Sequence, residues 1–429
     1  MPERTLSGGL DGYQRLAPNG AEEEVLMTES NLPLAGLRVL DISSFIAAPA
    51  AAVVLGDWGA DVIKVEGPEG DPNRTIMNDS ANYPTATVNY PWQMDSRNKR
   101  AISLDLKKPE ARAALDRLIA VSDILICNFP PPVRDKLRLT YDDVKKVNAK
   151  LIYASLTGYG ESGPDRDRPG FDVTAYFGRS GLLEAQRYEG GPPGVPGPAQ
   201  GDRATAMTLV SAILMALLHR GKTGEGSWVG TSLIGNGLWS CGVIAQAALC
   251  GAFLPPRPPL DRPRSALGNI YRSNDDRWLQ LTIVREDKLW EPLCRAIERP
   301  ELPGDPRFTT RESRRTHSAE LATILREVFA SRAFDHWLKV LSANEITFGV
   351  INRPQDIPDD VQAVVEGAIV ETAIDDMPRT LANPIRLGFA AQRVAGPAPA
   401  LGQHGDAVLR EAGMTSVEVA SLRASGALK

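Results

Sequence analysis

The chain has 429 residues, 43% of them hydrophobic and 24% charged, which fits a folded globular protein of about two or three domains and excludes a disordered or collagenous chain. Its 48 lysines and arginines against 53 aspartates and glutamates give a net charge of −5, which argues against a nucleic-acid partner. The four cysteines form no C-x-x-C pair and have no histidine at ligand spacing, so we expect no zinc site, no disulfide framework and a reducing, cytoplasmic location.

The first half of the chain predicts an α/β domain. Residues 1–33, rich in Gly, Glu, Asn and Pro, are expected to form a loose tail rather than a targeting signal. A strand at Arg38–Ile42, a helix within the small residues 46–55 and a strand at Asp61–Glu66 form a βαβ unit, which implies a parallel sheet with a right-handed crossover. The alternation continues with strands at 101–106, 124–127 and 151–156 and helices at 109–121 and 141–148.

The turn after the first strand argues against a dinucleotide site. Glu66 ends the second strand, where a ribose-binding acid would stand, but residues 43–49 contain no glycine. Without glycine the backbone cannot approach a pyrophosphate as the G-x-G-x-x-G fingerprint requires. Residues 221–223 are similar to the end of a P-loop, but Ala216 stands where its first glycine is needed, and a helix-capping turn explains them better.

Two carboxylates stand out in a long Gly- and Pro-rich loop predicted over residues 157–203. Loops of this length inside a compact domain are usually functional. Asp172 follows Gly170 and Phe171, and Asp202 follows Gly201 just before a buried helix predicted over 205–219. Asp202 has two interpretations: it caps that helix, or it attacks a thioester carbonyl at a place where glycine permits close approach.

The helix predicted over 205–219 also contains the longest apolar run of the chain, from Ala212 to Leu218. Crossing a bilayer takes about 20 apolar residues. We therefore expect no membrane-spanning segment.

A smaller α/β domain is predicted after a proline-rich spacer. The prolines within residues 255–259 favour an extended conformation and mark a domain boundary. Beyond them we expect a strand at 278–283 and helices at 288–297, 319–330 and 335–341.

A series of short motifs runs through the chain from about residue 34 to residue 413. They lie within residues 34–66, 98–107, 127–129, 153–160, 170–172, 201–202, 217–224, 271–281 and 401–404. In this order they resemble the family III CoA-transferases, the CaiB/BaiF group. The resemblance implies a Rossmann-like large domain (34–225), a linker (226–265), a small α/β domain (266–352) and a C-terminal segment (353–429) that returns to the large domain. It further implies ring-shaped subunits that are interlaced as a homodimer.

In that family an aspartate that matches Asp202 carries the reaction. The resemblance implies that it attacks an acyl-CoA, forms a mixed anhydride and then an enzyme–CoA thioester, and that a small carboxylic acid completes the exchange. Acyl-CoA is then a substrate, and no permanently bound cofactor or metal is implied. By the same resemblance CoA is held near Phe45, Ile46, Ala47, Leu104, Lys107, Asn128, Phe129, Pro130, Lys136, Leu137, Phe171 and Asp172.

Two alternatives remain within this resemblance. An α-methylacyl-CoA racemase shares the fold, but it needs a second acid–base group, which the racemases supply as a histidine before the aspartate of the earlier motif. This chain has Phe171 there, and phenylalanine cannot carry a proton, so we favour transfer. The other alternative is a catalytically silent acyl-CoA binder or a partner subunit of a heteromer, against which the presence of Asp202 argues.

The sequence does not identify the acyl group. Arg166, Arg168 and Arg203 lie near the predicted loops. They either pair with a second carboxylate of the substrate or are ordinary surface charges.

Overall fold

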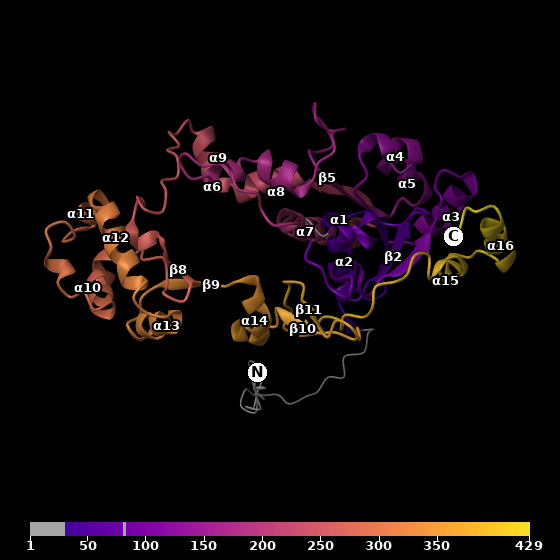
Figure 1. Cartoon of the computed structure of the whole chain (residues 1–429). Helices are drawn as coiled ribbons and strands as arrows, with labels where there is room; N and C mark the ends of the chain where they lie inside the picture. Colours follow the sequence, from indigo (N-terminus) through magenta and orange to yellow (C-terminus); the bar gives the residue numbers. More distant parts are fainter. Residues whose placement is uncertain (1–30, 80–82) are drawn as a thin grey trace.

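The core of the large domain is a six-stranded parallel sheet (Figure 1). The computed structural model describes residues 31–79 and 83–429, so the expected tail lies outside the described residues except for its last three. The strand order is β3-β2-β1-β4-β5-β6, and every neighbouring pair is parallel. The strands are β1 (Arg38–Ile42), β2 (Asp61–Glu66), β3 (Arg100–Ser103), β4 (Ile124–Cys127), β5 (Ile152–Thr157) and β6 (Ser227–Ser232). The predicted Rossmann-like domain with a parallel sheet is confirmed.

Strand β6 is the member of this sheet that the sequence did not predict. It lies in the segment 226–265 that was expected to be a linker, and so do helices α8 (Leu233–Ser240) and α9 (Gly242–Leu249). The strand forms an edge of the sheet, where its small and polar residues remain partly exposed. Because such a strand buries little apolar surface, its residue pattern does not distinguish it from a loop.

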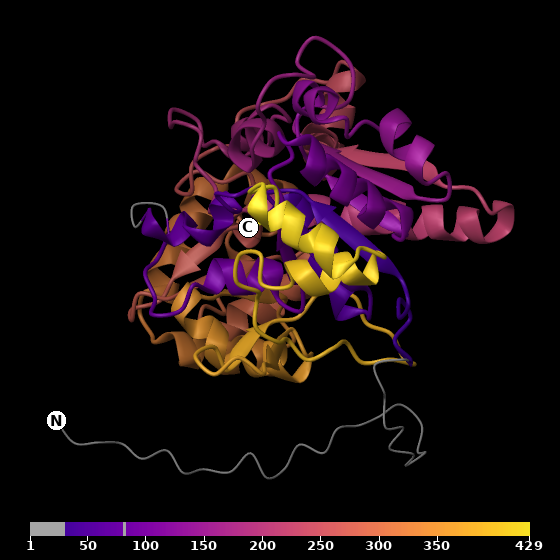
Figure 2. The ribbon, with the colours of Figure 1, turned by 90° about the vertical axis from the view of Figure 1, so that its right-hand side faces the viewer.

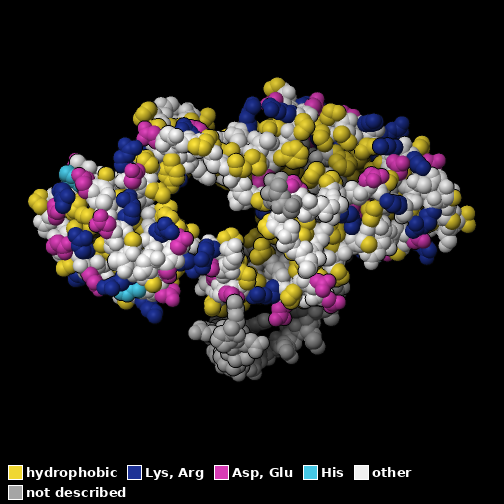
Figure 3. Space-filling model, viewed as in Figure 1, with side chains coloured by type: hydrophobic (Ala, Val, Ile, Leu, Met, Phe, Trp, Pro, Cys, Tyr) yellow, Lys and Arg dark blue, Asp and Glu magenta, His cyan; other side chains and the backbone are white. Residues whose placement is uncertain are grey.

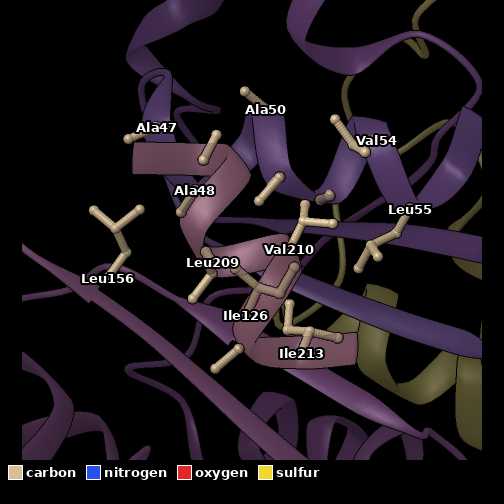
Figure 4. Packing of buried hydrophobic residues seen from close by; sticks show 14 of the residues in the cluster. Ala47, Ala48, Ala50, Val54, Leu55, Ile126, Leu156, Leu209, Val210 and Ile213 are labelled. Carbon is tan, nitrogen blue, oxygen red and sulfur yellow. The ribbon is translucent and has the colours of Figure 1, made fainter. Parts of the chain in front are cut away.

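Helices cover both faces of the sheet. On one face α1 (Ala47–Asp57) packs against α7 (Gln200–Thr223), and Figure 4 shows the small side chains of α1 beside Leu209, Val210 and Ile213 of α7. The other face is covered by α3 (Pro109–Ala120), α5 (Tyr141–Val147), α15 (Gly405–Glu411) and α16 (Ser416–Ala424). The C-terminal helices, yellow in Figure 2, pack there, and Leu428 pairs with Leu104 just after β3.

Helix α7 is longer than predicted. It begins at Gln200 and ends at Thr223, so Asp202 lies in its first turn and not before it. The glycines at 201 and 221 concealed both ends, because glycine has low helix propensity. By length and composition α7 could cross a membrane. The shorter helix predicted over residues 205–219 had excluded this. In this fold, however, α7 packs along α1 and β6 in the large domain.

The region 157–203 is not a continuous loop. It contains a π-helical turn, η4 (Asp172–Gly178), and the short helix α6 (Leu182–Gln186). Four other short elements also escaped prediction. Two of them begin with proline and a third has proline at its second position; proline is tolerated in the first turn of a helix but is otherwise typical of loops. The four elements are η2 (Pro72–Arg74), η3 (Ile76–Asn78), α2 (Tyr90–Ser96) and α4 (Pro131–Leu137).

The small domain combines an antiparallel sheet with helices around an aromatic core. Its strands are β7 (Ile270–Arg272), β8 (Trp278–Leu281) and β9 (Phe348–Ile351), in the order β7-β8-β9. Its helices are α10 (Glu286–Ala296), α11 (Arg311–Thr316), α12 (Ser318–Phe329) and α13 (Phe334–Ala343), and the short turns are η5 (Ala266–Gly268) and η6 (Leu302–Gly304). The predicted strand and three helices are all present, with ends shifted by one or two residues. The core contains Trp290, Phe308, Phe329 and Trp337.

Two connections join the domains and enclose an opening. The outward connection follows α9, and the return leads through η7 (Pro354–Asp359), α14 (Val361–Val365), β10 (Ile369–Glu371) and β11 (Arg379–Leu381). Figure 3 shows the opening between the small domain and the large domain. The subunit therefore has the ring shape expected from the sequence.

Candidate active site

The loops that follow β1 and β4 meet where the strand order of the sheet reverses. From β1 the chain proceeds to β2 on one side, whereas β4 and β5 lie on the other. Open parallel sheets bind ligands outside the carboxyl ends of the strands at such a point. Two hydrogen bonds join the loops: the Ser44 N–H donates to Asn128 Oδ1 (2.9 Å), and Asn128 Nδ2 donates to the Ser44 carbonyl oxygen (2.8 Å). The pair forms one wall of a cavity.

Phe45 holds a strained backbone conformation in this wall. Its φ of 64° is left-handed, which costs a residue other than glycine about 1–3 kcal/mol. Its N–H donates to Asp71 Oδ1 (3.0 Å), and Asp71 Oδ2 lies 2.7 Å from Lys64 Nζ. Because Asp71 and Lys64 are both buried, an ion pair inside the protein holds a turn that contains no glycine. The Phe45 ring contacts Phe171 edge to face, with centroids 5.8 Å apart.

A cavity of about 380 Å³ lies at the carboxyl ends of β1, β4 and β5, beside η4 and the start of α7. This volume is within the range of small-molecule sites. The lining is mainly apolar, and its charged members are Asp172 and Asp202. It consists of Ser44, Phe45, Ile46, Ala47, Ile76, Tyr83, Asn128, Phe129, Pro130, Leu156, Thr157, Gly158, Pro169, Gly170, Phe171, Asp172, Val173, Pro198, Ala199, Asp202 and Leu233.

Asp202 presents a carboxylate to the cavity from the third residue of α7. Burial raises its pKa, the charges of Asp172 and Asp95 raise it further, and Arg203 lowers it, so that the pKa is about 7. A carboxylate of this pKa is more basic than an ordinary one and is still partly ionised at neutral pH. The environment of Asp202 therefore suits a nucleophile.

Asp172, and not Asp202, lies against the backbone at the start of α7. Its pKa is raised by burial and lowered by the backbone N–H groups of residues 199–202. Neither of its carboxylate oxygens has a hydrogen-bond partner of good geometry among the described residues. Its carboxylate is so close to Gly201 that a Cβ at that position would overlap it and the ring of Tyr176. Two carboxylates thus share the positive end of a 24-residue helix, and the capping interpretation of Asp202 is not supported.

Most of the predicted site residues meet in the cavity. They are Phe45, Ile46, Ala47, Asn128, Phe129, Pro130, Phe171, Asp172 and Asp202. Leu104, by contrast, directly follows β3 and is fully buried in the core of the large domain. Leu137 packs against the same core. Lys107 and Lys136 are exposed in the segments that follow β3 and β4. They therefore lie on the side of the sheet where the strands have their carboxyl ends, as the cavity does.

Some lining residues have no signal in the sequence. Ile76 and Tyr83 come from the segment between β2 and α2, and Leu233 begins a helix in the expected linker. Their side chains contribute shape and apolar surface, and they belong to none of the sequence motifs described above. Only the folded chain shows that they face the same cavity as Asp202.

No metal centre is formed within residues 31–79 and 83–429, where no group of three or more His, Cys, Asp and Glu side chains could hold an ion. All four cysteines are free thiols. Cys250 is exposed, and Cys127, Cys241 and Cys294 are buried.

Comparison with known proteins identifies the family. Residues 34–405 match CoA-transferase family III. The chain belongs to this family. As a family III CoA-transferase it is an enzyme that uses an acyl-CoA as substrate.

Named CoA-transferases are similar to most of its length. The (R)-2-hydroxy-4-methylpentanoate CoA-transferase of Clostridioides difficile is 31% identical and covers 91% of this chain and 98% of its own length. The cinnamoyl-CoA:phenyllactate CoA-transferase of Clostridium sporogenes is 33% identical and covers 76% of this chain and 80% of its own length. A CaiB/BaiF family protein of solved structure, from Brucella suis, superposes with a TM-score of 0.80 at 30% identity, over 89% of this chain and 99% of that one.

Phe171 is the residue at which the sequence predicts that a racemase histidine is missing. Its ring lines the cavity, is 54% exposed and contacts Phe45. No histidine is part of the described lining, and the His404 imidazole accepts a hydrogen bond from the backbone of Ala101 instead. The structure therefore provides no imidazole for racemisation at the described residues of this site.

Proposed function

We propose that this CoA-transferase moves CoA from an acyl-CoA thioester to a free carboxylic acid, with Asp202 as the covalent nucleophile. The observation that carries the proposal is the position of Asp202, a carboxylate of raised pKa on the cavity where the loops of the parallel sheet converge. A nucleophilic carboxylate conserves the free energy of the thioester bond, first in an anhydride and then in an enzyme–CoA thioester, where hydrolysis would lose it.

The exchange takes four steps through Asp202. An Asp202 oxygen attacks the thioester carbonyl, the C–S bond breaks, and a mixed anhydride and the CoA thiolate result. The thiolate then attacks the aspartyl carbonyl of the anhydride, which gives an aspartyl–CoA thioester and releases the donor carboxylate. The incoming carboxylate attacks this thioester and expels the thiolate, which finally attacks the acyl carbonyl of the new anhydride and regenerates Asp202.

The same proposal assigns the other predicted residues to CoA binding. Phe45, Phe129 and Phe171 offer apolar surface for the pantetheine arm at the cavity. Lys107 and Lys136 are exposed cations at the same edge of the sheet and suit the phosphates as point charges. Leu104, which is buried in the core, supports the end of β3 and makes no direct contact in this proposal.

The proposal is tested by incubating the purified protein with an acyl-CoA donor and a mixture of carboxylic acids. We expect new CoA esters, identified by mass spectrometry, together with release of the donor acid. A chiral 2-methylacyl-CoA, incubated in parallel, should keep its configuration. Loss of configuration without any exchange would show that the enzyme is a racemase and that Phe171 is a misleading guide.

We also propose that two subunits interlace as a homodimer. The outer surfaces of α8, α9 and the following residues expose large apolar side chains, among them Trp239 (87%), Val243 (85%), Leu249 (82%) and Phe253 (86%). Monomeric proteins rarely expose so many contiguous apolar groups. The opening through the subunit leaves room for a second chain to pass (Figure 3).

We expect light scattering to give twice the chain mass of 46.4 kDa. Trp239→Asp should weaken the dimer, because it places a charge in the proposed apolar interface. Val417→Asp is the matched control, since Val417 is 80% exposed on α16. A monomeric wild-type protein would refute the interlaced arrangement.

A further inference from the structure

The cavity around Asp202 carries no positive charge from the described residues. Among its lining residues Tyr83 is close enough to Asp202 for the charge of that carboxylate to raise the pKa of its hydroxyl, after the larger effect of burial. Ile76, Val173 and Leu233 add apolar surface. None of the described lining residues is a lysine, an arginine or a histidine.

The three arginines that the sequence offered for a second substrate carboxylate each pair with an aspartate outside the cavity. Arg203 Nη1 lies 2.6 Å from Asp95 Oδ1, and Arg203 lines a separate cavity against α1 and α2. Arg166 lies 3.1 Å from Asp167. Arg168 is within 3.9 Å of Asp165 and lies over the Tyr159 ring. All three are absent from the lining of the Asp202 cavity.

The charges that do face the cavity are negative. Asp202 lies in the first turn of α7, and Asp172, at the start of η4, lies against that turn with both carboxylate oxygens buried. A second carboxylate on the substrate would lose water and meet charges of its own sign, which is strongly unfavourable in a site of low dielectric. An alkyl or aryl chain would instead gain from burial against Ile76, Val173 and Leu233, which are not among the aromatic residues assigned to the pantetheine arm.

We infer that this enzyme transfers CoA between monocarboxylic acids with apolar chains and discriminates against dicarboxylic acids. The inference rests on the proposed function, because it assigns the acyl group to the cavity beside Asp202. The deciding feature is the juxtaposition of an apolar wall with two carboxylates and no described cation.

The test compares hexanoate with glutarate, acids of nearly equal chain length that differ in the terminal group. With butyryl-CoA as donor, we expect kcat/KM for hexanoate to exceed that for glutarate by at least tenfold. Calorimetry on Asp202→Asn, which cannot turn over but keeps the Asp172 carboxylate and the apolar lining, should still show tighter binding of hexanoyl-CoA than of glutaryl-CoA. Equal kcat/KM values for the two acids, or a higher value for glutarate, would overturn the inference while leaving the transferase function intact.

A variant with an added positive charge tests the inference without relying on the absolute kcat/KM values of the wild-type enzyme. Ile76→Lys introduces a cation into the lining, and we expect it to raise the glutarate-to-hexanoate ratio of kcat/KM by at least fivefold. Val417→Lys, on the exposed face of α16, is the matched control and should leave the ratio unchanged. If no acid accepts CoA from any donor, the proposed function fails, and the two thioester affinities alone decide the substrate class.

Discussion

Replacing Asp202 by asparagine is expected to reduce CoA transfer by at least about 10³-fold while the protein remains folded. The amide is nearly isosteric with the carboxylate, but it cannot form the anhydride or the aspartyl thioester. In the wild-type protein, intact-mass analysis after addition of acyl-CoA should show a CoA adduct on the chain. The adduct should be absent from Asp202→Asn, and a variant that keeps both adduct and turnover would exclude Asp202 as the nucleophile.

The same substitution should make the protein more stable at high pH. Burial and Asp172 raise the pKa of Asp202 to about 7, whereas an aspartate in the unfolded chain has a pKa near 4. The unfolded state therefore releases this proton at lower pH than the folded state, and Asp202 destabilises the fold increasingly as pH rises from about 4 to about 7. Asparagine has no charge to bury, so the gain should be about 4 kcal/mol above pH 7, from about three pKa units, and only about 1.5 kcal/mol at pH 5.

Thermal unfolding at pH 5 and pH 8 measures this difference. Asp335→Asn is the matched control, because Asp335 is an exposed aspartate in the first turn of α13, away from the cavity. It should change neither transfer nor the pH dependence of stability. Equal Tm shifts for Asp202→Asn at both pH values would show that the Asp202 carboxylate is not perturbed by its surroundings.

The parts of the fold that are buried on both faces were predictable from the sequence. β1, β2 and β4 begin and end at the predicted residues, since short runs of Val, Ile and Leu between turn residues are typical of interior strands of a parallel sheet. Edge strand β6 and the short helix α4, which begins with two prolines, were missed, because they bury little apolar surface and their composition is that of loops. The ends of α7 were missed because glycine lies near both.

The candidate site divides in the same way. Asp172 and Asp202 were identified from the sequence as carboxylates close to glycine in a long predicted loop, and they line the cavity together. Ile76, Tyr83 and Leu233 act only through position, and position depends on tertiary contacts that no local pattern encodes. Phe45 is intermediate: the missing glycine in its turn was visible, but the ion pair of Asp71 and Lys64 that supports its left-handed backbone was not.

Gly201 determines how closely the start of α7, which carries Asp202, approaches the buried carboxylate of Asp172. A side chain there would overlap the Tyr176 ring and the Asp172 carboxylate, so the start of α7 can approach η4 only because residue 201 has no Cβ. This close approach brings the backbone of residues 199–202 to Asp172 and holds Asp202 at the cavity. Gly201 therefore has a steric role, and its φ is not in the left-handed region.

Gly201→Ala should accordingly lower both stability and activity. Forcing a methyl group into a packed site costs about 1–3 kcal/mol of unfolding free energy, and a displacement of Asp202 by about 1 Å reduces kcat/KM by about 10²-fold. Gly221→Ala is the matched control, because Gly221 lies in the last turn of the same helix, and a Cβ added there would meet nothing within 4 Å. There alanine should stabilise the helix by up to about 1 kcal/mol and leave transfer unchanged. Chemical unfolding and initial rates of the two variants distinguish the steric effect on Asp202 from the effect of helix propensity. If Gly201→Ala behaves like Gly221→Ala, the start of α7 tolerates a side chain. In that case the close contact with Asp172 does not position Asp202.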